Sequence, residues 1–346
     1  MALFWSLILA TILPGNTLPV EGSFEPADWR ASLRAAYRSS TDLCDFLGVD
    51  PKVACPQAES DFPILAPREF VQRMEPGNPR DPLLLQVVSQ SAELVDSGEL
   101  DPVGELPAER HKGLLQKYDH RVLLILSGAC AIHCRYCFRR NFPYDEAAKG
   151  RAEWQEWLEL LQSDSTIEEV IFSGGDPLSV GDDRLSWFIQ QVSEIPHIRR
   201  LRFHTRLPVV IPSRVTPEFT SLLESVEQAV YVVMHINHAQ ELDESVWAAI
   251  RRLHRAGTQV LNQAVLLRGI NDNFEALREL CVQLADRQVL PYYLHQLDPV
   301  RGGVHFGVPD AEALELVAAL RADLPGYAVP RLVRELSGEA SKTLIH

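Results

Sequence analysis

RVLLILSGACAIHCRYC, residues 121–137, joins an apolar run to three closely spaced cysteines. The run at 121–127 has the length and the branched aliphatic side chains of a buried strand. Similar apolar runs recur downstream at intervals of about 30 residues. They occupy residues 169–174, 200–205, 229–235, 259–267 and 291–296. The sequence therefore predicts six strands, and the first of them leads directly into the thiols.

Amphipathic stretches with the period of a helix separate these strands. They occupy residues 151–162, 182–195, 216–226, 244–257 and 273–287. Alternation of strand and helix predicts repeated βα units, because parallel strands need a crossover connection that is usually a helix. An α/β fold with a parallel sheet follows, and the pattern fits either a doubly wound sheet or a barrel-like sheet.

Polar side chains gather where the predicted strands end. The clusters are Ser173 to Asp176, His204 to Arg206, His235 with Asn237, Asn262 with Gln263, and His295 to Asp298. In parallel α/β sheets the ligand site lies at the carboxyl ends of the strands. One such cluster is usually a turn or a helix cap, but five consecutive clusters predict a shared active site.

The chain on either side of this core has a different pattern. An apolar extension at 1–22 precedes a helical N-terminal region at 23–115, with helices expected at 28–37, 41–49 and 83–95. The α/β core is expected at 116–305. The C-terminal segment, 306–346, is expected to contain a helix at 310–324, a strand at 327–336 and a turn rich in small residues.

Composition excludes several classes of protein. The net charge of -14 and the pI of about 5.3 argue against a protein that wraps nucleic acid, which would need a basic surface. The apolar run at 3–13 is too short to span a bilayer, and no basic residue precedes it as in a signal peptide. Adjacent unpaired thiols favour the reducing cytoplasm.

Three thiols are an unusual set of ligands. Structural zinc needs a fourth ligand, and His133 is poorly placed to chelate together with the adjacent Cys134. A redox pair at Cys134 and Cys137 would leave Cys130 unexplained. A cubane [4Fe-4S] cluster fits the count, because three cysteines bind three irons and the fourth iron keeps an open coordination position.

This cysteine spacing, with Tyr136 before the last thiol, resembles the radical S-adenosylmethionine (radical SAM) superfamily. The resemblance implies that Cys130, Cys134 and Cys137 hold a [4Fe-4S] cluster whose open iron binds S-adenosylmethionine, and that reductive cleavage yields a deoxyadenosyl radical. It also implies that Gly174, Gly175, Asp176 and His235 contact S-adenosylmethionine. Glycine permits close backbone approach, and a carboxylate can accept from an ammonium group.

Longer stretches resemble lysine 2,3-aminomutases. They are KYDHRVLLILSGACAIHCRYCFRRNFPY, IFSGGDPL, LNQAVLLRGIND, PYYLHQLDPVRGGVHF and SGEASKT, within 117–343. The resemblance implies an isomerase with a partial (βα)6 TIM-like barrel and a second cofactor, pyridoxal phosphate, bound covalently through Lys342. By position alone, a lysine so near the end of the chain is usually a solvated charge.

The same resemblance assigns the remaining site residues. Those assigned to pyridoxal phosphate are Lys117, Tyr118 and Arg121, near its phosphate, with Gln263 in the shared site. Those assigned to the substrate are Arg139 for the carboxylate, and Asp298 and Glu335 for the distal ammonium. Three of these residues have a simpler interpretation: Arg121 and Arg139 as solvated surface charges, and Asp298 as a turn residue before proline.

Two departures from the longer aminomutases suggest a particular branch. Glu335 stands where those enzymes have aspartate, and no cysteine-bearing extension follows Lys342. Both features resemble the short enzymes that make (R)-β-lysine for modification of elongation factor P. We therefore expect lysine as substrate, a functional link to elongation factor P and its lysyl ligase, and a possible homo-oligomer. The alternatives are another substrate such as arginine, a radical SAM enzyme without pyridoxal phosphate, or an electron carrier.

Overall fold

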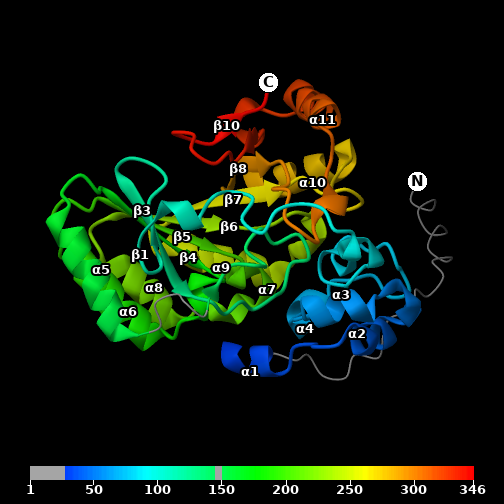
Figure 1. Ribbon diagram of the computed structural model, residues 1–346, viewed down its shortest axis with the longest axis horizontal. Helices are drawn as coiled ribbons and strands as arrows, with labels where there is room; N and C mark the ends of the chain where they lie inside the picture. Colours follow the sequence, from blue (N-terminus) through cyan, green and yellow to red (C-terminus); the bar gives the residue numbers. More distant parts are fainter. Residues whose placement is uncertain (1–27, 145–149) are drawn as a thin grey trace, which may run out of the picture.

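The computed structural model describes residues 28–144 and 150–346, and within them ten strands form one sheet in chain order (Figure 1). The apolar extension expected at 1–22 lies outside the described residues. The strands are β1 (Glu109–His111), β2 (Leu114–Leu115), β3 (Arg121–Ser127), β4 (Glu169–Gly174), β5 (Arg200–Thr205), β6 (Ala229–Met234), β7 (Gln259–Val265), β8 (Leu290–His295), β9 (Arg331–Arg334) and β10 (Thr343–Leu344).

The six predicted strands are confirmed as β3 to β8, and they pair parallel to one another. The strand expected at 327–336 is confirmed in a shorter form as β9, which pairs parallel to β8. Antiparallel β2 and β10 pair with β3 and β9 at the two edges of this parallel core. The sheet is therefore an open, partial barrel, as the resemblance implied.

Helices follow the strands and cover the sheet. They are α5 (Arg151–Ser163), α6 (Asp182–Ser193), α7 (Leu207–Val210), α8 (Pro217–Ser225), α9 (Glu244–Arg255), α10 (Phe274–Ala285) and α11 (Asp310–Asp323). The five predicted core helices are confirmed as α5, α6, α8, α9 and α10. None of the helices in the described ranges has the length and hydrophobicity needed to cross a membrane.

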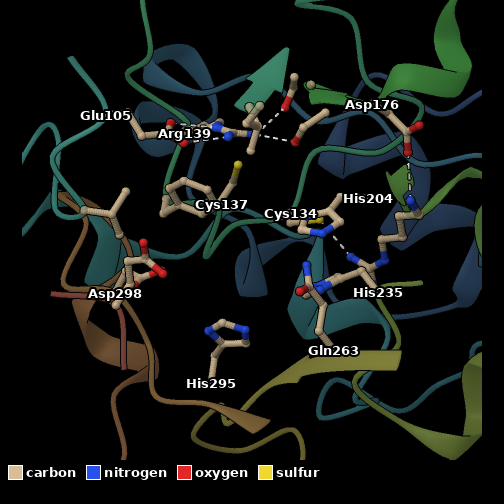
Figure 2. A pocket seen from close by; sticks show the side chains of 18 of the residues that line it. Glu105, Cys134, Cys137, Arg139, Asp176, His204, His235, Gln263, His295 and Asp298 are labelled. Atoms are coloured by element: carbon tan, nitrogen blue, oxygen red, sulfur yellow. Dashed lines mark hydrogen bonds and ion pairs between the residues drawn. The ribbon is translucent and has the colours of Figure 1, made fainter. Parts of the chain in front are cut away.

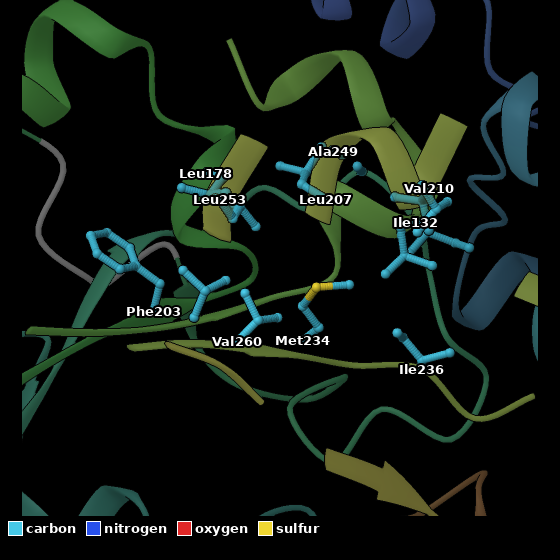
Figure 3. Packing of buried hydrophobic residues seen from close by; sticks show 14 of the residues in the cluster. Ile132, Leu178, Phe203, Leu207, Val210, Met234, Ile236, Ala249, Leu253 and Val260 are labelled. Atoms are coloured by element: carbon cyan, nitrogen blue, oxygen red, sulfur yellow. The ribbon is translucent and has the colours of Figure 1, made fainter. Parts of the chain in front are cut away.

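Aromatic side chains form much of the interface between α5, α6 and the sheet. Trp154 on α5 lies 4.9 Å from Phe188 on α6, measured between ring centroids, and Phe172 on β4 lies 4.8 Å from Phe203 on β5. Figure 3 shows the neighbouring packing, in which Ala249 and Leu253, one turn apart on α9, face the strands. Burial of these side chains is the main favourable term that holds the helices on the sheet.

The N-terminal region is helical but more broken than predicted. Its helices are α1 (Trp29–Arg34), α2 (Ser40–Leu47), α3 (Pro56–Asp61) and α4 (Arg68–Val71). The continuous helix expected at 83–95 is wrong: the segment forms two 3-10 turns, η2 (Leu84–Gln86) and η3 (Ser91–Leu94). Gln90 between them is extended, and its amide donates to the Glu93 carboxylate at 2.8 Å, which starts a new turn.

The other connections are short 3-10 turns. They are η1 (Pro51–Val53), η4 (Leu106–Ala108), η6 (Pro177–Ser179), η7 (Pro212–Arg214), η8 (Ala239–Glu241), η9 (Val304–Phe306) and η10 (Gly326–Ala328). The hairpin of β1 and β2 was not predicted, because strands of two and three residues are too short to show a period. This hairpin extends the sheet beside β3.

The C-terminal segment folds back on the sheet. Antiparallel pairing places Thr343 of β10 opposite Arg334 of β9. This register brings Lys342 next to Glu335, although the two are seven residues apart in the chain. In Figure 1 the segment runs above β7 and β8, away from the N-terminal helices α2 to α4.

Candidate active site

A cavity of about 470 Å³ opens at the carboxyl ends of the parallel strands (Figure 2). Every residue that the sequence singled out for a cofactor or substrate lines it. They are Lys117, Tyr118, Arg121, Cys130, Cys134, Cys137, Arg139, Gly174, Gly175, Asp176, His235, Gln263, Asp298, Glu335 and Lys342. The tertiary structure thus brings together residues that span more than 200 positions of sequence.

The three cysteines lie on the loop after β3 and are unpaired. Burial raises the pKa of Cys137 to about 12 and raises that of Cys130 as well, so both thiols hold their protons unless a metal displaces them. His133 Nδ1 lies 2.7 Å from the carbonyl of Pro63, which leaves its Nε2 as the other ring nitrogen.

The donor set fits a cluster better than a single ion. In the described part of the chain, no three His, Cys, Asp or Glu side chains converge as ligands of one metal ion. A cubane does not require such convergence, because each thiolate binds a different iron. Cys130, Cys134 and Cys137 could therefore hold a [4Fe-4S] cluster, and Gly174 and Gly175 lie on the same wall of the cavity.

The glycine loop after β4 packs directly on the cysteine loop. Gly174 has φ +129, and an added Cβ at Gly175 would lie 2.5 Å from the carbonyl oxygen of Ala129. Only glycine allows two backbones to approach so closely. The backbone of β4 therefore reaches the loop that carries Cys130.

Asp176 is held inside this loop. Its carboxylate accepts hydrogen bonds from the amides of Leu178, Arg206 and Leu207, and from Thr205 Oγ1 at 2.7 Å. These donors occupy the lone pairs of the carboxylate. In this arrangement the Asp176 side chain fastens the glycine loop to the end of β5, and an ammonium group would have to displace one of these donors to reach it.

A network of polar side chains surrounds Tyr136. Arg206 and Asn237 both donate to Tyr136 Oη, at 2.8 and 2.6 Å. The same two residues also donate to Gln86 Oε1, and Tyr136 Oη donates to that oxygen at 2.9 Å. Tyr136 Oη also lies 2.9 Å from His235 Nε2. Burial lowers the pKa of His235 to about 3, so the ring is neutral and suited to accept.

Arg139 makes a complete set of contacts inside the protein. Its Nε donates to Glu105 Oε2 at 2.6 Å, and its Nη2 donates to Glu105 Oε1 at 2.5 Å. Its Nη1 donates to Ser173 Oγ at 2.9 Å and to the Gly174 carbonyl at 3.0 Å. A substrate carboxylate would reach this fork only by displacing one of these partners (Figure 2).

Lys342 and Glu335 form an ion pair at the other side of the cavity. Glu335 also accepts from Tyr118 Oη at 2.6 Å and from Lys117 Nζ at 3.4 Å. Burial alone would raise the pKa of Glu335, but Lys342 and the other donors lower this pKa to about 2. Arg121 lies over the Tyr118 ring, 5.3 Å from its centroid. Three cations therefore border this end of the cavity.

Several buried polar atoms of residues that line the cavity have no hydrogen-bond partner among the described residues. They include Asp298 Oδ1, His204 Nε2 and His295 Nε2. Burial raises the pKa of Asp298 to about 7 and lowers the pKa of both imidazoles well below their usual range. Unpaired buried polar atoms are costly, so their presence around one cavity indicates a polar ligand.

These features fit pyridoxal phosphate. Lys342 supplies an amine in the cavity, and Lys117 and Arg121 supply cations for a phosphate. The neutral imidazoles of His204 and His295 supply polar contacts that no protein group takes. Gln263 lines the same cavity from β7.

The sequence missed several residues that shape the site. Glu105 and Gln86 come from the N-terminal region, where the sequence has no motif. Arg206, His204 and His295 stood out as polar strand ends but received no role. Their position after an apolar strand was the available signal, whereas nothing local marks Glu105.

Comparison with known proteins identifies the family. The model of the radical SAM superfamily matches residues 124–281, which include the three cysteines and strands β4 to β7. An L-lysine 2,3-aminomutase of Escherichia coli is 44% identical over 324 residues, covering 91% of this chain and 94% of the relative. The chain belongs to the lysine 2,3-aminomutase family of radical SAM enzymes. It is thus related to isomerases.

Two further members of the lysine 2,3-aminomutase family show the range of similarity. The Haemophilus influenzae enzyme is 45% identical over 285 residues, covering 82% of this chain and 84% of the relative. The Clostridium subterminale enzyme is 30% identical over 321 residues, covering 91% of this chain and 77% of the relative. Asp298, Glu335 and Lys342 lie beyond the stretch matched by the superfamily model, and the family relationship rests on these relatives, which match 82% to 91% of the chain.

Proposed function

We propose that the protein is a radical SAM aminomutase that converts α-lysine to (R)-β-lysine with the help of pyridoxal phosphate. One observation carries the proposal: the cysteine triad, the glycine loop and the Lys342–Glu335 pair all border a single cavity. A radical formed at the cysteines can reach only a substrate held close to them. A cavity shared with the amine of Lys342 provides that proximity.

The two cofactors have complementary tasks. Reductive cleavage of S-adenosylmethionine at the cluster supplies a radical strong enough to remove hydrogen from an unactivated carbon, and pyridoxal phosphate supplies a conjugated carrier for the migrating amino group. Lys342 would hold this second cofactor between turnovers, and Lys117, Tyr118 and Arg121 would anchor its phosphate. His235, which follows β6, would border S-adenosylmethionine, and Gln263 on β7 would border pyridoxal phosphate.

The charges around the cavity favour a cationic side chain on the substrate. Asp298 presents an unpartnered carboxyl oxygen, and Glu335 is ionised beside it. A distal ammonium would pair with them, while Arg139 would receive the carboxylate once Glu105 moves. Lysine therefore ranks above arginine, whose longer planar head needs a bidentate partner, and well above glutamate.

The cofactor assignment is tested by absorbance and iron content. Wild-type protein reconstituted with pyridoxal phosphate should show a band near the visible edge. Lys342→Ala should lose the band and keep its iron, because the cysteines lie elsewhere on the cavity. The matched control is Lys52→Ala, an exposed lysine on η1. A band that survives in Lys342→Ala would refute the role of Lys342.

The substrate assignment is tested by turnover. Anaerobically reconstituted enzyme should convert lysine, with arginine poorer and glutamate inert. Conversion of glutamate but not lysine would refute the role of Asp298. Replacement of any one of Cys130, Cys134 or Cys137 by alanine should abolish cleavage of S-adenosylmethionine, and full cleavage in all three variants would refute the cluster.

We further propose that the product serves the modification of elongation factor P in the cytoplasm. Support comes from the resemblance to the short aminomutases and from the unpaired cysteines, which suit a reducing compartment. The lysyl ligase should transfer the product of this enzyme to elongation factor P, detected as a mass increase on the intact factor. If the product is shown to be β-lysine and the ligase does not transfer it to elongation factor P, this assignment is refuted.

A further inference from the structure

Arg206, at the end of β5, is a buried arginine whose guanidinium touches a cysteine of the triad. Its Nη1 donates to Cys134 Sγ at 2.7 Å and to Tyr136 Oη at 2.8 Å. Its Nη2 donates to Gln86 Oε1 at 2.6 Å and to Glu241 Oε2 at 2.9 Å. The residue is 6% exposed. The charge on this side chain is therefore directed at a sulfur from within a water-poor site.

The surroundings hold this guanidinium in one place. Glu241 is 0% exposed, and its other oxygen accepts from the amide of Asn237 at 2.9 Å. The backbone amide of Arg206 donates to Asp176 Oδ2 at 2.8 Å, which ties the residue to the glycine loop. The guanidinium carbon lies 5.3 Å from the ring centroid of Phe70. A side chain restrained on so many sides cannot swing away from Cys134.

A charged donor at a cluster sulfur affects the electron affinity of the cluster. One-electron reduction adds negative charge to the cluster and its thiolates, and a nearby guanidinium stabilises that charge. Hydrogen bonds to the sulfurs and the burial of the site set the potential of Fe–S clusters. The low dielectric of a buried site strengthens the effect. Glu241 opposes it, because its negative charge partly cancels that of Arg206.

We propose that Arg206 is a positioning residue that raises the reduction potential of the cluster through Cys134, and that Glu241 limits this increase. The inference rests on the proposed cluster and adds a determinant of its redox poise. One electron from an external reductant enters the cluster, and no other bond changes in this step. The Arg206–Glu241 pair thus controls how readily the enzyme reaches the reduced state from which S-adenosylmethionine is cleaved.

The test is the midpoint potential of the reconstituted full-length protein, measured by redox titration with dithionite and monitored by electron paramagnetic resonance. In Arg206→Gln the ratio of reduced to oxidised cluster at a fixed ambient potential should fall about tenfold. For a one-electron couple this corresponds to a decrease of about 59 mV in the midpoint potential. In Glu241→Gln the ratio should rise, because the guanidinium stays and its counter-charge is lost. A structural defect would not move the two variants in opposite directions.

Arg214→Gln is the matched control. Arg214 is 0% exposed and donates to the carbonyls of Leu178 and Val180, but it contacts none of the three cysteines. The cluster of the Arg214→Gln variant should have the same midpoint potential as that of the wild type. If Arg206→Gln cannot be loaded with iron, the Glu241→Gln potential decides alone: an increase supports the proposal, and no change or a decrease overturns it.

The outcome also separates this inference from the function on which it rests. Wild-type protein that takes up iron and cleaves S-adenosylmethionine, with unchanged potentials in both variants, overturns the role of Arg206 and leaves the proposed function intact. Wild-type protein that holds no cluster under reconstitution overturns the proposed function itself.

Discussion

Binding of lysine should depend on pH through Asp298. Its buried Oδ1 has no partner among the described residues, and loss of hydration raises its pKa to about 7 although Lys342 opposes the shift. Below this pKa the carboxyl is neutral and must release its proton before it can pair with an ammonium. Lysine affinity should therefore rise with pH up to about 7 and then level off.

The size of the effect follows from the pKa. Each pH unit below the pKa costs about 1.4 kcal/mol, or a factor of about ten in affinity. Relative to the plateau well above the pKa, the loss at about pH 5.5 is about thirtyfold, or about 2 kcal/mol. Other cavity groups do not add to this slope: Glu335 stays ionised with a pKa of about 2, and the lowered pKa values of His204 and His295 keep both rings neutral.

Titration calorimetry with lysine at several pH values measures this slope, and repetition in two buffers of different ionisation enthalpy counts the released protons. In Asp298→Asn the slope and the proton release should both disappear. Asp286→Asn, at an exposed helix cap, should behave as the wild type. Affinity that is independent of pH in the wild type, or a slope that persists in Asp298→Asn, would show that the reasoning is wrong.

Three further outcomes are expected. First, Asp298→Asn should stabilise the ligand-free protein by about 4 kcal/mol at pH 8, because burial raises the wild-type pKa from the ordinary 3.8 to about 7 and the cost of ionising the buried carboxyl builds up between these two values. Denaturant unfolding should show the gain vanish near pH 4, and an equal gain at both pH values would contradict the assignment. Second, Gly175→Ala should abolish binding of S-adenosylmethionine in equilibrium dialysis, because the new Cβ would lie 2.5 Å from a backbone oxygen of Ala129. Gly326→Ala is the control, because an added Cβ at Gly326 would have no atom within 4 Å. Equal binding of S-adenosylmethionine by both variants would contradict this prediction. Third, Trp157→Ala, at a fully buried position on α5, should cost about 3 to 5 kcal/mol of unfolding free energy, and a loss near zero would contradict its place in the core.

The parts of the site that were predictable are those in which chemistry follows a strand directly. Cys130 and Gly174 lie at or just beyond the ends of β3 and β4, and His235 follows β6. In a parallel sheet all strands end at one edge, so a local pattern of apolar run and polar residue already implies a shared location. The strand pattern alone was therefore enough to predict that Cys130, Gly174 and His235 lie near one another at this edge.

The contacts that were not predictable join segments without local signals. Glu105 occupies the fork of Arg139, and Gln86 sits beside Arg206, yet both come from irregular chain before β3. The helix expected at 83–95 was wrong for a related reason. Tertiary contacts such as the buried pair of Glu93 with Arg135 outweigh a modest helical preference.

By itself the sequence determined the six strands, the helices between them and the cysteine loop, because these depend on periodicity and spacing within short segments, whereas the role of Lys342 was implied only by the family resemblance. Only the tertiary structure decided the charge states and pairings in the cavity. The register of β9 and β10 sets Lys342 against Glu335, and burial without a partner raises the pKa of Asp298. Desolvation and Coulomb energies depend on what surrounds a group in space, and residues distant in the chain provide those surroundings.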